Sequence, residues 1–396
     1  MENKKKPEIR FPTFEGDWEQ RKLGESVKFL NGRAYKQQEL LDIGKYRVLR
    51  VGNFNTNDKW YYSDLELEAD KYANPGDLLY LWATSFGPEI WNEEKVIYHY
   101  HIWKLEIIDK SIDKEYLYTW LLTDKERIRQ NTNGSTMVHV TKGNMEERRF
   151  EFPSDIIEQQ KVGSFFRQLD DTITLHQQEL TTLKQTKQGF LQKMFPKEGE
   201  KVPEVRFPEF TDEWEQCKLG DIFKKDTQKN KDLEFHSDSV ISVAKMKLSP
   251  PSAKSSDEYM KTYNKIRKGN IAFEGHTNDE FPNGRFVLND CQDGIVSHIY
   301  DVYSAVDEYN NEFMKRYINN PDVMRKILIN ATSSARMMKS LNSIEFLKQS
   351  ILLPILSEQQ KIGEFFYQLD NTLTLHQREL ELLQLTKKAF LQKLFV

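Results

Sequence analysis

The 396-residue sequence repeats once, and this repeat limits what the chain can fold into. Residues 7–25 recur at 203–221 with twelve of nineteen aligned positions identical, and residues 156–195 recur at 356–395 with twenty-five of forty identical. The stretches between them, roughly 26–150 and 222–352, share little sequence. Because drift after a duplication would erode all parts alike, the contrast predicts a shared frame that carries two divergent inserts with similar jobs on different targets.

The longer repeated segment has the apolar spacing of a coiled-coil helix, with steps of four and three residues. The predicted seam positions of the first copy are Val162, Phe166, Leu169, Ile173, His176, Leu180, Leu183 and Phe190, and those of the second are Ile362, Phe366, Leu369, Leu373, His376, Leu380, Leu383 and Phe390. Some forty helical residues span roughly 60 Å. Since one exposed seam would be unsatisfied, we expect the two helices to pack on each other in antiparallel orientation.

Local signals predict where both helices begin. Asp155 with Glu158 and Ser357 with Gln360 have the spacing of a capping box, in which two side chains satisfy the first free amides of a helix. The sequence therefore places the helix starts next to these residues.

Four seam positions are polar, namely His176, His376, Lys187 and Lys387. Polar residues in an apolar seam commonly fix the register of a coiled coil. Metal binding by the two histidines is the less favoured alternative, because the seam holds no acidic or cysteine companion. No metal site is predicted.

Composition points to a globular protein of two to three domains, with 38% hydrophobic and 30% charged residues. The charged start and the absence of a long apolar stretch predict neither a signal peptide nor a membrane span, so a cytoplasmic location is expected. Cys217 and Cys291 fit no zinc or redox spacing and are expected to be reduced. The formal net charge of −4 is low for a chain that grips DNA alone, so clustered basic residues or partner subunits must supply phosphate contacts.

Motifs for catalysis are missing from the sequence. It contains no Gly-rich nucleotide loop, no phosphate-binding loop and no Asn-Pro-Pro-Tyr-like segment, which argues against a stand-alone DNA methyltransferase or ATPase. His99 and His101 fall in a stretch, 96–103, that is typical of one strand, where ordinary sheet packing is the favoured role. We expect no catalytic residue in this chain.

Several segments are typical of one family. Residues 153–161 and 354–361 each contain Glu-Gln-Gln-Lys, and the first insert contains Pro75-Gly76-Asp77-Leu78-Leu79 and Gly134-Ser135-Thr136 with Thr141-Lys142. With these segments, the duplicated frame resembles the specificity-subunit family of type I restriction-modification systems. The second insert departs from this pattern, with Lys268-Gly269-Asn270-Ile271 and Ala331-Thr332-Ser333-Ser334 at the corresponding places.

Together, the resemblance and the repeat imply an α+β chain with two mixed α/β target recognition domains, separated by two long antiparallel coiled-coil helices and related by an internal pseudo-two-fold repeat. The expected segments are an N-terminal repeat arm at 1–25, a first target recognition domain at 26–153, a central helix at 154–196, a second arm at 197–221, a second target recognition domain at 222–353 and a C-terminal helix at 354–396.

The resemblance implies a non-catalytic subunit in which each domain recognises one half of a bipartite, asymmetric site in double-stranded DNA. The helices would set the spacer between the half-sites and dock two methyltransferase subunits, and restriction/translocase subunits would join the complex. S-adenosylmethionine, ATP and Mg²⁺ would belong to those partners, with no cofactor in this chain. The alternative is a non-catalytic coiled-coil scaffold with two ligand-binding inserts.

Polar and basic residues in loops are the candidates for DNA contacts, because such side chains bind base edges and phosphates. In the first insert they are Arg33, Arg47, Arg50, Asn53, Thr84, Ser85, Thr136, His139 and Lys142, and in the second Lys245, Lys247, His276, Thr277, Asn278, Arg285, Ser333, Ser334, Arg336 and Lys339.

Overall fold

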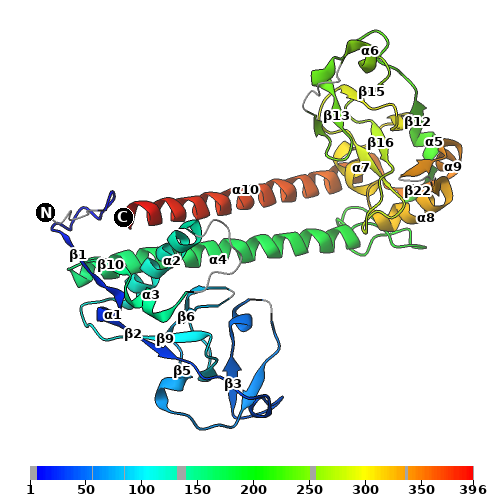
Figure 1. Cartoon of the computed structure of the whole chain (residues 1–396). Helices are drawn as coiled ribbons and strands as arrows, with labels where there is room; N and C mark the ends of the chain where they lie inside the picture. The colour runs from blue at the N-terminus through cyan, green and yellow to red at the C-terminus, as the bar shows by residue number, and fades with distance from the viewer. Residues whose placement is uncertain are drawn as a thin grey trace. The chain divides into compact units, whose positions relative to one another are not determined.

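The computed structural model describes residues 7–55, 57–83, 85–131, 140–249, 256–334 and 338–395 (Figure 1). The chain divides into two compact units, the first made of residues 1–178 and 378–396 and the second of residues 179–377. Two long helices, α4 (Ile156–Lys193) and α10 (Leu356–Leu394), each contribute residues to both units. No described helix has the length and apolar content needed to span a membrane.

The insert of the first unit contains two four-stranded sheets. One is antiparallel, in the order β2 (Val27–Asn31), β9 (Ile102–Ile107), β6 (Leu78–Leu81) and β7 (Gly87–Ile90). The other has the order β4 (Tyr61–Ser63), β3 (Tyr46–Leu49), β8 (Val96–Tyr98) and β5 (Tyr72–Ala73). Helix α2 (Lys114–Asn131) packs on the first sheet, and its side chains Tyr116, Leu117 and Trp120 are buried in one core with the sheet.

The insert of the second unit has a four-stranded sheet in the order β12 (Phe223–Asp226), β19 (Val302–Ala305), β16 (Ile271–Glu274) and β17 (Arg285–Leu288). Three two-stranded ladders accompany it: β13 (Ile241–Ser242) with β14 (Lys247–Leu248), β15 (Asn264–Ile266) with β18 (Gly294–Val296), and β20 (Thr332–Ser334) with β21 (Lys339–Leu341). Its helices are α6 (Asp257–Met260), α7 (Asn311–Tyr317) and α8 (Pro321–Ala331).

The two inserts share one topology although their sequences diverge. The order β2-β9-β6-β7 matches β12-β19-β16-β17, and the antiparallel pair β5·β8 matches β15·β18. A parallel neighbour is also common to both, since Val48 lies beside Ile97 and Val240 beside Ile295. The duplication therefore extends through the inserts at the level of strand pairing.

The Pro-Gly-Asp segment of the first insert and its Lys-Gly-Asn counterpart make the same turn. Gly76 and Gly269 have φ angles of +87° and +89°, a left-handed conformation that glycine adopts without strain. Each glycine lies between equivalent strands, β5 and β6 or β15 and β16. The sequence motif thus shapes the backbone at this point.

The repeated arms form small ladders at the base of each insert. β1 (Trp18–Lys22) pairs with β10 (Arg149–Pro153), and β11 (Glu215–Lys218) pairs with β22 (Ser350–Leu353). Short helices follow the arms and precede the closing strands: α1 (Leu23–Ser26), α3 (Lys142–Glu146), α5 (Leu219–Ile222) and α9 (Ser343–Lys348). Each ladder joins the start of an insert to its end.

The long helices pack in opposite directions, as predicted. In the first unit, Phe165 near the start of α4 contacts Phe390 near the end of α10, with ring centroids 5.1 Å apart. In the second unit, Phe190 and Phe365 make the reverse pair at 4.9 Å. This pairing and the mixed strand and helix content confirm the predicted fold class, whereas the six segment boundaries stay a prediction.

The predicted capping boxes are wrong. Asp155 does accept a hydrogen bond from the Ile157 amide at 2.8 Å, but the Glu158 carboxylate is bound by Arg10. In the second copy, α10 already begins at Leu356, so Ser357 lies inside the helix. In the first copy, Asp155 therefore still caps the helix, whereas an ion pair with Arg10 occupies the Glu158 half of the predicted box.

The expected single strand at 96–103 is also wrong. β8 ends at Tyr98 and β9 begins at Ile102, and the Ile102 amide donates to the His99 carbonyl at 3.0 Å. His99, Tyr100 and His101 therefore form a tight turn between two strands of different sheets. The alternating sequence runs through the turn without a glycine or proline to mark it.

Candidate nucleic-acid interface

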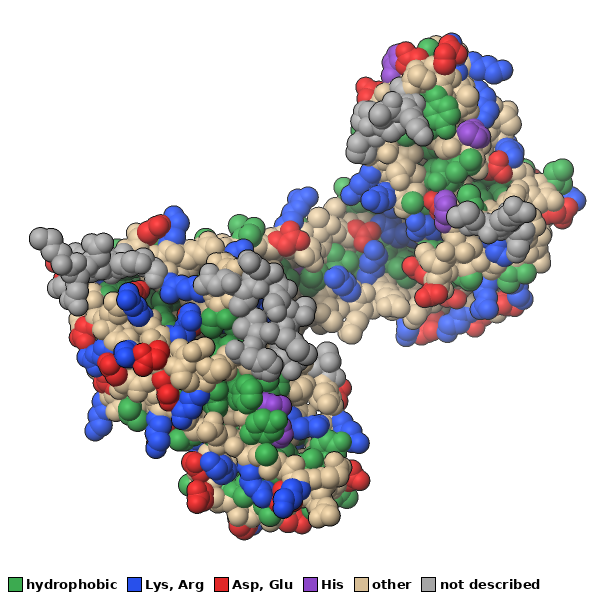
Figure 2. All heavy atoms as spheres, in the orientation of Figure 1, with side chains coloured by type: hydrophobic (Ala, Val, Ile, Leu, Met, Phe, Trp, Pro, Cys, Tyr) green, Lys and Arg blue, Asp and Glu red, His purple; other side chains and the backbone are tan. Residues whose placement is uncertain are grey.

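The β8–β9 turn of the first unit carries a cluster of aromatic rings. The His101 ring centroid lies 4.0 Å from that of Tyr100 and 4.9 Å from those of Trp82 and His99. The Trp82 indole donates to the Tyr100 carbonyl at 2.7 Å, which ties the end of β6 to the turn. Figure 2 shows histidine side chains beside hydrophobic and basic ones on this unit. The sheet pairing places these rings together.

His99 is the half-buried member of this cluster. Burial, together with the neighbouring His101 and the positive charge of Arg50, lowers the pKa of His99 to about 4. Its ring also stacks on Tyr35, at 6.4 Å between centroids. His99 is therefore neutral at physiological pH.

Arg50 precedes and Asn53 belongs to a short 3-10 helix, Val51–Phe54, that follows β3 next to this turn. The Arg50 guanidinium lies 4.3 Å from the centre of the Tyr61 ring and donates to the Lys59 carbonyl at 3.2 Å. Asn53 accepts from the Arg50 amide, and Asn55 donates to the Ser85 hydroxyl at 3.3 Å. The structure thus brings three predicted residues, Arg50, Asn53 and Ser85, to one group of loops.

Three other candidates of the first insert have partners within the protein. Arg33 binds Glu39 at 2.8 Å, and Arg47 binds both Glu93 and Glu94 at 2.8 Å. Lys142 donates to the Phe29 carbonyl at 2.9 Å. Thr84, Thr136 and His139 lie outside the described residues, as do Gly134 and Ser135.

In the second unit, the loop after β16 holds His276, Thr277 and Asn278 on the surface. The buried Glu274 carboxylate contacts Nδ1 of His276, so it orients an exposed imidazole. Lys339, in β21, donates its amide to the Gly275 carbonyl at 2.8 Å. The predicted residues His276 and Lys339 consequently lie on neighbouring segments.

Arg285 joins this group from β17. Its guanidinium donates to the Ala244 carbonyl at 2.9 Å and lies 5.0 Å from the centre of the Phe281 ring. The turn that contains Ala244 also contains the exposed Lys245, while Lys247 is exposed in β14. Ser333 is exposed in β20, and the Ser334 side chain and Arg336 lie outside what the structure describes.

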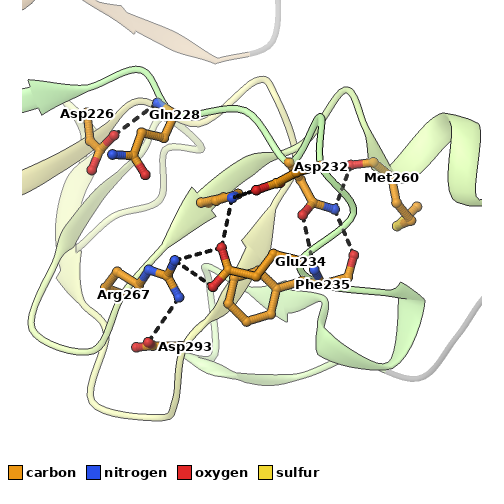
Figure 3. A network of polar contacts seen from close by, with 10 residues as sticks. Asp226, Gln228, Asp232, Glu234, Phe235, Met260, Arg267 and Asp293 are labelled. Atoms are coloured by element: carbon orange, nitrogen blue, oxygen red, sulfur yellow. Dashed lines mark hydrogen bonds and ion pairs between the residues drawn. The ribbon is translucent and has the colours of Figure 1, made fainter.

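A separate polar network in the second unit fixes the loop after β12 (Figure 3). Lys265 is bound by Asp232 and Glu234 at 2.7 Å each, and Arg267 bridges Glu234 and Asp293. These carboxylates neutralise two basic residues of the insert. The network therefore holds this loop in place, and the charges of Lys265 and Arg267 are compensated within the protein rather than directed at DNA phosphates.

The polar seam residues have partners on the opposite helix. Lys187 pairs with Asp370 in the second unit, and Lys387 pairs with Asp170 in the first. Nδ1 of His176 lies 3.9 Å from Oε2 of Glu379 in the first unit, and Nδ1 of His376 lies 3.7 Å from Oε2 of Glu179 in the second. All sixteen predicted seam residues are buried or half-buried. The role of the four polar seam residues in fixing the register of the two helices remains a prediction.

Sequence reasoning missed Trp82 and Tyr100 as surface candidates and Ile299 at the corresponding turn of the second unit. Aromatic and aliphatic residues inside a strand-like pattern are typical of a core. The equivalence of the turns before β9 and β19 is visible only in the strand pairing, so the local sequence held no signal for it.

Comparison with known proteins identifies the family. A family model described as the type I restriction modification DNA specificity domain matches residues 15–185 and again residues 211–385. The type I restriction enzyme MjaVIII specificity subunit of Methanocaldococcus jannaschii is 25% identical over 211 residues, which are 52% of this chain and 49% of that protein. The chain therefore matches about half the length of this curated relative.

Two solved structures have the same fold at low sequence identity. The type I restriction-modification system S subunit from M. genitalium aligns with a TM-score of 0.61 and 14% identity over 99% of both chains. A structure that concerns complex assembly and conformational transition of the type I restriction-modification system aligns with a TM-score of 0.52 and 12% identity, over 96% of this chain and 97% of that one. With two family matches that span most of its length, the chain belongs to the type I restriction modification DNA specificity domain family and contains the domain twice.

Proposed function

We propose that the chain is the DNA-specificity subunit of a type I restriction-modification complex, in which each insert is a target recognition domain for one half of a bipartite, asymmetric site. One observation carries the proposal: the inserts share a strand order but differ in the residues at equivalent loops. Trp82 and Ser85 follow β6, whereas His276 and Asn278 follow the equivalent β16. One framework with different loop side chains suits two different DNA half-sequences.

In this proposal, α4 and α10 set the spacer between the half-sites and dock two methyltransferase subunits. Support comes from the helices themselves, because each is continuous and contributes to both units. Half-sites about one helical turn apart, roughly 34 Å, lie on one face of a DNA duplex. A helix of fixed length and phase is suited to hold two recognition domains at such a spacing.

The charge distribution supports the idea that partner subunits make part of the DNA contacts. The formal net charge is −4, and carboxylates neutralise Arg33, Arg47, Lys265 and Arg267 within the inserts. Since phosphate contacts dominate the affinity of DNA-binding proteins, the methyltransferase subunits are expected to supply many of them. The chain itself is non-catalytic in this proposal, and S-adenosylmethionine, ATP and Mg²⁺ act in the methyltransferase and restriction/translocase subunits.

The test is methylation in a host that lacks the system. We expect expression of the chain with the type I methyltransferase of the same genome to methylate adenine in one bipartite sequence, and expression of the methyltransferase alone to leave that sequence unmodified. Sequencing that detects methyladenine measures both. Equal methylation without the chain, or methylation of a continuous motif, would contradict the proposal.

A further inference from the structure

Two tight turns at equivalent places in the inserts each expose a large apolar side chain. Tyr100 lies in the β8–β9 turn and is 39% exposed, and Ile299 lies in the β18–β19 turn and is 51% exposed. The strands on both sides correspond in pairing, since β8 pairs with β5 as β18 pairs with β15. Exposure of an apolar residue is common at single positions. Exposed apolar residues also recur at the equivalent positions Ile108 and Val306, so the neighbours of the two turns are what distinguish Tyr100 and Ile299.

Both turns are held by hydrogen bonds to neighbouring segments. In the first unit, the Trp82 indole donates to the Tyr100 carbonyl, and the Tyr100 amide donates to the Arg33 carbonyl at 3.1 Å. In the second, the Asn264 side chain donates to the Tyr300 carbonyl at 2.8 Å. The apolar side chains are thus presented on fixed backbone, which lowers the conformational cost of using them in a contact.

Candidate DNA-contact residues lie beside each turn. In the first unit, Arg50 contributes to the electrostatic environment of His99, and its partners are a carbonyl oxygen and the Tyr61 ring. In the second, the Phe273 amide of β16 donates to the Asp301 carbonyl at 2.9 Å, and the loop after β16 carries the exposed His276. Apolar side chains beside polar and basic ones form a combination by which proteins contact the bases and the backbone of nucleic acids.

We propose that Tyr100 and Ile299 are wedge residues, each of which inserts its side chain against the bases of its own DNA half-site and unstacks one base step. This inference rests on the proposed function and names a contact within it. Apolar wedges of this kind separate adjacent base pairs and deform the duplex at a few positions. The rings of Trp82 and His101 pack against the Tyr100 ring, at 6.0 and 4.0 Å between centroids.

Each turn has a matched control at the opposite end of the strand that follows it. Ile108 follows β9 and is 54% exposed, and Val306 follows β19 and is 55% exposed. They are also equivalent to each other, because the Ile108 amide donates to the Ser26 carbonyl and the Val306 amide to the Ile222 carbonyl. Replacement of these residues removes similar apolar surface far along the strand from the turn.

The experiment uses the assembled complex with its methyltransferase and duplexes that contain the methylated sequence, with 2-aminopurine placed at each position in turn. Unstacking raises the fluorescence of this base. Apart from the target adenine, which a methyltransferase itself takes out of the stack, we expect a rise at one further step in each half-site. Tyr100→Ala and Tyr100→Asn should abolish the rise in the first half-site only and weaken binding about tenfold, while Tyr100→Phe retains it. Ile299→Ala should abolish the rise in the second half-site only, and Ile108→Ala and Val306→Ala should change neither.

Salt dependence separates a wedge from a phosphate contact. Tyr100→Ala should leave the slope of log affinity against log salt unchanged, whereas Arg50→Ala should reduce it by about one. The wedge is overturned if both turn variants keep wild-type fluorescence and affinity, or if they lose complex assembly while DNA fluorescence is retained, which would mark a protein contact. A wild-type complex that fails to bind the bipartite duplex would overturn the proposed function instead.

Discussion

Arg206 holds Glu358 by two parallel hydrogen bonds, from Nε to Oε1 and from Nη2 to Oε2, each 2.7 Å long. The Glu358 side chain is 0% exposed. Arg10 binds Glu158 in the same way in the first unit, also at 2.7 Å in both bonds. The arginine comes from the repeated arm and the glutamate from the first turn of a long helix. This pair explains why both segments repeat together.

The buried ion pair gives the first prediction. Arg206→Met leaves a buried carboxylate without its cation and should lower the free energy of unfolding of the second unit by about 3–5 kcal/mol. The double variant Arg206→Met with Glu358→Gln should recover part of this loss. Urea denaturation followed by hydrogen exchange in peptides of that unit measures both. A loss below about 1 kcal/mol would mean that the pair is replaceable by solvent.

His99 gives a prediction on pH. Its pKa is lowered from 6.5 to about 4 in the folded protein, so the unfolded chain binds the proton more readily. The stabilisation that the neutral His99 contributes to the folded protein is complete above pH 6.5 and is lost as the pH falls from 6.5 towards 4. A shift of this size amounts to about 3 kcal/mol, and about half of that is expected because the ring is only partly buried.

The variant His99→Gln cannot titrate and should therefore lose less stability over that pH range than the wild type. Thermal unfolding at pH 7, 6, 5 and 4 provides the measurement. Parallel curves for the variant and the wild type would show that His99 is protonated equally in both states.

The glycines of the equivalent turns give a third prediction. Gly76→Ala and Gly269→Ala should each destabilise their unit by about 1–2 kcal/mol, because a side chain disfavours the positive φ angle at these positions. Gly189→Ala is the control, since a Cβ atom at this helical residue meets nothing within 4 Å. It should stabilise the chain by up to about 1 kcal/mol. Equal effects at all three sites would contradict the role of the turn conformation.

The helices give a prediction about spacing. Insertion of four residues in α4 near Thr181 should lengthen the spacer between the methylated half-sites or abolish recognition, because four residues shift the phase of the seam. A methylation map of a host that expresses the variant provides the measurement. An unchanged spacer with full activity would show that the helices do not determine it.

A feature could be predicted from the sequence when residues that are close together in the chain determine it. The heptad spacing from Val162 to Phe190 specified both the helix and its buried face, since helical periodicity is written in neighbouring residues. Glu158 shows the opposite case. Its spacing from Asp155 suggested a local cap, but the group that binds it, Arg10, lies 148 residues away in the sequence. Local patterns carry no information about such competition.

The candidate interface was predicted only in part for the same reason. Arg50 and Asn53 were identified as loop residues, but Tyr100 lay inside an alternating pattern that is typical of a strand. Trp82 reaches Tyr100 across the pairing of β6 with β9, and such pairing between distant segments sets which side chains meet. Likewise, the common strand order of the inserts could not be seen in sequences that share so few residues.

A domain exchange tests the central claim most directly. Residues 26–153 would be replaced by the corresponding segment of a relative with a known methylated sequence, and adenine methylation would be mapped across the host genome. The account predicts that one half of the bipartite sequence changes to that of the relative, while the other half and the spacer stay the same. A change in both halves, or in neither, with the complex assembled and active would contradict it.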